Sequence, residues 1–221
     1  MLWRPTIYLT NLCFVAIVPL ICTYISSQSG HSNAYLSTIS ANYLLYPERL
    51  IFAVGVGLFT LIYGFITRPI SQYIIKNKQQ ALFAKQAEIL ILGVFFTIAA
   101  IPAHLILGLH ASLAGILAGS CLLWMNTIIE HGQCSQWIKY CRTSIYFMAC
   151  ITAFGMILTF PHRIIFELSA ARGNIEKLLF LLGLDQRWFV FAHFEWAFFY
   201  SVLFFFMTCT PLTKKSKQAK S

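Results

Sequence analysis

The chain has 221 residues, of which 58% are hydrophobic and only 10% are charged, and its mean hydropathy is +0.71. These values lie well beyond those of an ordinary soluble domain and exclude that class. The formal net charge of +9 is no sign of nucleic-acid binding, because the basic residues form short clusters between apolar runs, as in the cytosolic loops of membrane proteins. We therefore expect an integral membrane protein with no nucleic-acid partner.

Six segments approach the length of about 20 mostly apolar residues that a membrane helix needs. Neither an internal repeat nor a second domain is visible. The first segment is long for a signal peptide and lacks a clear cleavage site, so we interpret it as an uncleaved signal anchor. The expected fold is all-α, a single six-helix transmembrane domain with a basic tail at 211–221. Its helices are predicted at 7–26, 50–67, 88–108, 111–129, 143–160 and 189–210.

The distribution of charge predicts the orientation. If the N-terminus lies in the cytosol, eleven of the sixteen Lys and Arg residues also fall on that side. The positive-inside rule then places both termini in the cytosol. The eleven basic residues are Arg4, Arg68, Lys76, Lys78, Lys85, Lys139, Arg142, Lys214, Lys215, Lys217 and Lys220.

Small residues and prolines suggest how the helices are joined and packed. A tight turn at 108–110 is expected to link the third and fourth helices. In the fourth, "ASLAGILAGS" has Gly115 and Gly119 at GxxxG spacing, and we expect this face to pack closely on a neighbouring helix of the same bundle, with a dimer interface as the less favoured alternative. Pro19 and Pro102 are expected to bend the first and third helices.

The cysteines and histidines give no metal-binding pattern. The seven cysteines form no CxxC pair, and no two histidines show H-x(3)-H spacing. We therefore expect no metal or other cofactor. Cys134 and Cys141 are predicted to share a polar cytosolic loop, where a stable disulfide is not expected.

Two ionisable residues inside the last predicted helix are the first sign of function. The stretch "AHFEWAFFYSVLFFF" at 192–206 contains His193 and Glu195, and an ionisable group at bilayer depth costs roughly 2.5 kcal/mol or more. By helical rise, Glu195 lies roughly 10 Å from the lumenal end of its helix, and His104 lies about 6 Å from that of the third. Residues two positions apart point about 200° apart around a helix, so we orient Glu195, rather than His193, toward the interior.

Further polar residues are expected at the same lumenal end. Glu195 and His104 are the candidate acid/base pair for catalysis. Structural roles remain open for every member, such as a Glu48–Arg49 ion pair at a helix start, a turn role for His110, or pairing of Glu195 with an arginine. The candidate substrate-binding residues at this end are Glu48, Arg49, His110, His162, Arg163 and His193.

Several short motifs resemble the damage-regulated autophagy modulator family. They are the hydroxyl-rich first lumenal loop with "IS" before Pro47-x-Arg49, His110 before the fourth helix, and Phe194-Glu195-Trp196 in the last helix. The likeness is greatest to the branch of the second post-GPI-attachment factor. The positions that match are Ser40, Pro47, Arg49, His110, His162 and Glu195.

The resemblance implies a multi-pass protein of the Golgi or endoplasmic reticulum membrane that acts on or presents (lyso-)GPI acyl chains at the lumenal face. It adds Ser40 to the candidate substrate-binding residues. The implied partners are membrane lipids, GPI-anchored proteins or their lipid moiety, and other GPI-remodelling proteins. Whether the protein is an acyltransferase or an accessory factor is open, since no nucleophile–histidine motif is present. The alternatives are a non-enzymatic membrane regulator, with a lysosomal location, and a small transporter.

Overall fold

The computed structural model describes residues 5–30, 38–39, 45–67, 70–101, 107–160 and 186–210. The described residues are almost entirely helical and contain no β-strand, only an isolated bridge between Ile75 and Gly132. The predicted all-α fold is confirmed. The elements are α1 (Pro5–Gln28), α2 (Glu48–Leu61), the π-helix η2 (Ile62–Thr67), α3 (Ser71–Ile74), α4 (Lys78–Ala100), α5 (Leu107–His131), α6 (Gln136–Thr159) and α9 (Gln186–Thr208).

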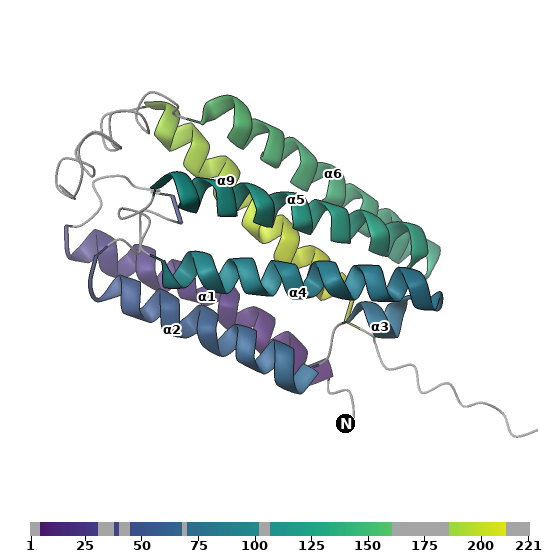
Figure 1. The fold of residues 1–221 in the computed structure, drawn as a ribbon. Helices are drawn as coiled ribbons and strands as arrows, with labels where there is room; N and C mark the ends of the chain where they lie inside the picture. The colour runs from purple at the N-terminus through teal and green to yellow at the C-terminus, as the bar shows by residue number, and fades with distance from the viewer. Residues whose placement is uncertain are drawn as a thin grey trace, which may run out of the picture.

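The long helices form a closed ring in chain order (Figure 1). Contacts run from α1 to α2, α2 to α4, α4 to α5, α5 to α6, α6 to α9, and from α9 back to α1. The Tyr8 hydroxyl donates to the Phe206 carbonyl at 3.3 Å, so α1 begins where α9 ends. We call this the N-terminal end of the bundle. The other end, where α1 finishes and α2, α5 and α9 begin, we call the mouth end.

Five of the helices are long and apolar enough to cross a membrane: α1, α4, α5, α6 and α9. Length and composition alone support this statement, and they agree with a multi-pass membrane protein. The remaining predicted span, 50–67, is helical but consists of a 14-residue α2 continued by the six-residue η2. Its crossing of the membrane stays a prediction.

The π-helix is held by polar side chains from α1 and α4. The Asn11 amide donates to the Phe59 carbonyl at 3.1 Å, next to the point where the α-helix gives way to the π-helix. Tyr63, in the first turn of η2, donates its hydroxyl to the Glu88 carboxylate. These contacts supply partners at a distortion of the helix, which the interior of a membrane protein requires.

The third predicted span, 88–108, was wrong at both ends. Helix α4 begins ten residues earlier because the Asn77 side chain caps it, accepting from Gln79 N at 3.0 Å. It stops at Ala100, and Ile101 is extended (φ −90°, ψ 122°). Proline disfavours the helical conformation in the residue before it, so Pro102 follows the helix rather than bending it.

Two further boundaries differ from the prediction. The turn expected at 108–110 lies within the first turn of α5, which begins at Leu107. Helix α6 begins at Gln136, where the Ser135 hydroxyl accepts from Ile138 N at 3.4 Å. Cys141, expected in a loop, is therefore helical, and only Cys134 lies in the short connection before α6.

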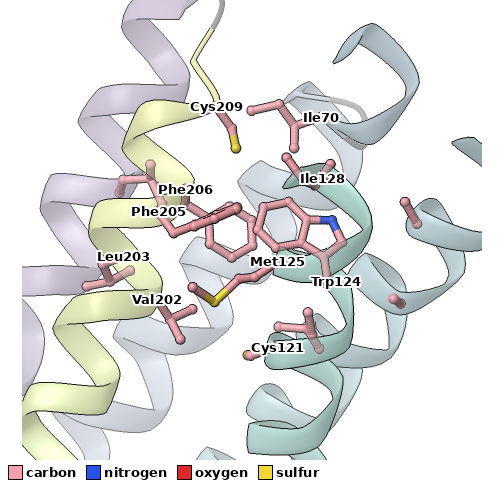
Figure 2. Close-up of a cluster of buried hydrophobic side chains, with 14 of the residues drawn as sticks. Ile70, Cys121, Trp124, Met125, Ile128, Val202, Leu203, Phe205, Phe206 and Cys209 are labelled. Carbon is pink, nitrogen blue, oxygen red and sulfur yellow. The ribbon is translucent and has the colours of Figure 1, made fainter. Parts of the chain in front are cut away.

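Aromatic side chains fill the interior of the bundle in the half nearer its N-terminal end (Figure 2). The Trp124 ring of α5 stacks on Phe206 of α9, with centroids 4.1 Å apart and 16° between the planes. Phe205 meets the same indole edge-on at 5.6 Å, and Tyr63 meets Phe206 at 6.2 Å. Such pairs add about 0.5–1.5 kcal/mol each beyond area burial. They matter here because lipid gives helices little hydrophobic reason to associate.

The glycines show which helix faces are packed. A Cβ at Gly155 of α6 would lie 2.6 Å from the Phe194 ring of α9, and one at Gly55 of α2 would lie 2.7 Å from Val18 of α1. At Gly115 and Gly119 of α5 an added Cβ would meet nothing within 4 Å. The prediction that these two glycines pack against another helix of the bundle was therefore wrong.

Candidate functional site at the mouth end

The structure describes five of the nine candidate site residues, and all five belong to the mouth-end portions of their helices. Glu48 and Arg49 begin α2, His110 lies in the first turn of α5, and His193 and Glu195 lie in α9. Ser40, His104, His162 and Arg163 lie outside the described residues.

Glu195 binds the first loop between the helices. It is the tenth residue of α9, about 14 Å along that helix by the standard rise, and its side chain is half-buried. Its Oε2 accepts the Ile39 backbone N–H at 2.7 Å. A hydrogen bond to an ionised acceptor is roughly twice as strong as a neutral one. The carboxylate therefore holds the segment 38–39 against the bundle.

An apolar cluster receives that segment. Ile39 is 8% exposed and packs among side chains of α1, α2, α4 and α9, while the neighbouring Thr38 is fully buried. One side chain from the loop thus contacts a cluster drawn from four helices. The other buried members are Val18, Cys22, Phe52, Val56, Ala99 and Trp196.

Glu48 and Arg49 are neighbours in different environments. Glu48 is 1% exposed, and its backbone carbonyl accepts the Cys22 thiol at 3.4 Å, which ties α2 to α1. The Arg49 side chain is half-buried. No ion pair joins it to Glu48 or to any other residue that the structure describes.

The two histidines at this end also differ. His193 is exposed, its Nδ1 lies 2.8 Å from the Phe189 carbonyl and its ring packs edge-on against Phe189 at 4.3 Å. It faces away from the interior, whereas Glu195 on the same helix reaches the loop segment. His110 is 5% exposed within the bundle and is a helical residue rather than a turn residue.

A second buried carboxylate, at the N-terminal end, is absent from the predicted site. Glu88 of α4 is 1% exposed and accepts from Ile70 N at 2.7 Å, Ser71 N at 3.1 Å, Ser71 Oγ at 2.5 Å and the Tyr63 hydroxyl. It ties α4 to η2 and to α3. The signal for it was in the sequence, because the buried Ala84 and Ile91 lie four residues before and three after it on one helical face.

The mouth end therefore combines a half-buried guanidinium, two partly or fully buried carboxylates and an apolar cluster beneath them. Guanidinium is a preferred protein partner of phosphate.

Comparisons of the chain with protein-family models, with curated proteins and with solved structures found no match.

Proposed function

We propose that the protein is a factor for remodelling the lipid part of GPI anchors, acting on or presenting (lyso-)GPI acyl chains at the mouth end. In this proposal the mouth end faces the lumen of the Golgi or endoplasmic reticulum. GPI-anchored proteins or their lipid moiety are the partners, with other remodelling proteins beside them.

The observation that supports the proposal most is that Arg49 lies three residues before Phe52 on α2, and Phe52 belongs to the apolar cluster with Ile39 and Trp196. Phe52 is one helical turn after Glu48, so the polar start of α2 leads directly into the cluster. A GPI lipid carries a phosphate at the membrane surface and acyl chains below it. Arg49 would hold the phosphate through paired N–H donors, and Glu195 would keep the 38–39 segment in place above the chains. The motifs shared with the GPI-factor branch point to the same substrate.

The test uses cells that lack the protein, rescued with variants at normal expression. The lipid species released from GPI-anchored proteins are measured by mass spectrometry. We expect Arg49→Ala to leave lyso-GPI species or shed anchors that the wild-type protein corrects. Arg49→Lys should rescue in part, because lysine keeps the positive charge but lacks the paired N–H donors of the guanidinium. Lys139→Ala, at the N-terminal end, is the matched control and should rescue fully.

Two substitutions at Glu195 separate chemistry from positioning. Glu195→Gln keeps an oxygen that can accept the Ile39 N–H but removes the charge and the titratable proton, whereas Glu195→Ala removes both. Loss of function in both variants would assign acid/base work to Glu195. Loss in the alanine variant alone would make it a positioning residue. A normal anchor profile in the deletion cells would refute the proposed function.

A non-enzymatic membrane regulator is the second candidate, and the bond from Glu195 to the Ile39 backbone favours it, because that bond gives the carboxylate a structural task. Steady residence in lysosomes together with normal GPI anchors in the deletion cells would support this candidate instead.

A further inference from the structure

Arg142 is a buried arginine that binds the C-terminal end of α9. It is the seventh residue of α6 and is only 3% exposed. Its Nη2 donates to the Thr208 carbonyl at 3.0 Å, and its Nε donates to Thr208 Oγ1 at 3.3 Å. A cation at a helix C-terminus is favourable because the last carbonyls carry a partial negative charge. That partial charge does not neutralise a whole guanidinium.

Carboxylates at this end of the bundle are engaged elsewhere. The Glu88 carboxylate is surrounded by donors from Tyr63, Ile70 and Ser71. Glu130 is bound by the Asn126 amide at 2.9 Å and lies 3.6 Å from His131.

The remaining acidic residues belong to other parts of the chain. Of the seven Asp and Glu residues, two are at the mouth end and three fall between α6 and α9. Within the described part of the chain Arg142 therefore makes no ion pair. A buried charge without a counter-charge costs several kcal/mol. The five acidic residues away from this end are Glu48 and Glu195 at the mouth end, and Glu167, Glu176 and Asp185 between α6 and α9.

Two buried hydrogen-bonding groups near this contact lack a partner among the described residues. Arg142 Nη1 is buried and makes no hydrogen bond. Thr210 Oγ1, two residues beyond the capped Thr208, is likewise buried without a partner, and its residue is 9% exposed. A buried donor without a hydrogen-bond partner costs about 1–3 kcal/mol, and more when the donor is charged. Both groups can donate to the same kind of ligand, an anion.

The depth of Arg142 indicates where such an anion would come from. Arg142 lies about 9 Å along α6 from Gln136 by helical rise. Trp137 and Tyr140 are exposed between these two residues, and exposed aromatic residues of this kind mark the headgroup level of a membrane. Phosphate is the anion of that level.

We propose that Arg142 and Thr210 form a phosphate-binding site at the N-terminal end of the bundle, and that a phospholipid headgroup occupies it. The guanidinium supplies the charge and the free Nη1 donor, and the threonine hydroxyl supplies a second donor. The site is separate from the mouth end and does not depend on the function proposed there.

The test uses the full chain purified in a phosphate-free maltoside detergent, with phosphatidylglycerol or inorganic phosphate added. Native mass spectrometry and the thermal unfolding midpoint report binding. We expect phosphatidylglycerol to bind and to raise the midpoint, with a Kd at least about ten-fold weaker in Arg142→Gln. Lys139→Gln removes the same charge from an exposed position of α6 and should change the Kd less than two-fold.

Thr210→Val keeps the Arg142 contact with Thr208 and removes only the hydroxyl, so it tests the site even if Arg142→Gln unfolds. Weaker phosphatidylglycerol binding in Thr210→Val supports the site. Equal stabilisation by inorganic phosphate, lost in the same variants, would retain the phosphate site but overturn the assignment to a lipid. Unchanged phosphatidylglycerol binding in both variants would overturn the proposal and leave Arg142 as a helix cap.

Discussion

Glu88 shows how one buried carboxylate can organise an end of the bundle. Its oxygens accept from the hydroxyl of Tyr63, the N–H of Ile70 and both donors of Ser71, so η2 and the start of α3 share one acceptor group on α4. Ionisable residues in membrane segments are expensive unless they are paired in this way. The energetic role of Glu88 is therefore to satisfy the backbone where the chain turns from η2 into α3.

Replacing this carboxylate should be costly. Glu88→Ala leaves the buried Ser71 and Ile70 donors without an acceptor, and each lost partner costs about 1 kcal/mol or more, so we expect a loss of about 3 kcal/mol or more. Thermal unfolding of the purified protein in detergent measures it. Glu130→Ala, which removes an exposed carboxylate at the same end, should leave the midpoint nearly unchanged, and equal effects of the two substitutions would contradict this account.

At the scale of elements, apolar windows located the helices but misplaced their ends. A window of mean hydropathy cannot extend into "KNKQQALFAKQAE", which is rich in Lys and Gln, although Asn77 and the buried Ala84, Ala87 and Ile91 mark a helix there. The same error hid Glu88, since a predicted start at 88 made it a terminal residue. Reading N-caps first, Asn77 and Ser135, would have recovered both α4 and α6.

Tertiary contacts cannot be predicted from hydropathy or N-cap residues. Nothing local tells that Ile39 donates to Glu195, 156 positions away, or that Gly115 faces open space while Gly155 faces a ring. Which glycine is packed depends on how each helix is rotated in the ring. That rotation is set by the partners and not by the GxxxG spacing itself.

The two glycines make a matched pair of tests for helix packing. In Gly155→Ala the new Cβ overlaps the Phe194 ring and should cost about 1–3 kcal/mol, the usual range for overpacking. Gly115→Ala should be neutral or slightly stabilising, because the Cβ meets nothing and alanine favours helix by up to about 1 kcal/mol. Thermal unfolding midpoints of the two variants decide between these expectations. A larger loss for Gly115→Ala would show that α5 is packed there.

At the scale of the whole molecule, the ring places the start of α1 and the end of α9 together at one end of the bundle. Basic residues near this end, among them Lys78, Lys85 and Lys139, predict that it faces the cytosol. The exposed Cys134, in the connection between α5 and α6, lies at the same end and offers a direct probe.

A membrane-impermeant maleimide should label Cys134 only after the plasma membrane is selectively permeabilised with the internal membranes left intact. Cys209 at the same end should stay silent, because burial raises the pKa of its thiol to about 12 and the thiolate is the reactive form. Cys134→Ser is the control and should abolish the permeabilisation-dependent signal. Labelling that needs the internal membranes to be opened would reverse the orientation.

The closure of the ring by α9 also has a consequence for biosynthesis. This helix is the last of the described helices to leave the ribosome, yet it carries Phe199, Phe205 and Phe206, the partners of Phe95 and Trp124. Until α9 is synthesised, the aromatic side chains that the earlier helices turn inward lack their packing partners, and the Tyr8 hydroxyl lacks the Phe206 carbonyl as its acceptor. A nonsense codon between Thr159 and Gln186 therefore yields an open bundle that lacks only α9 among the described helices, the kind of product that membrane quality control degrades.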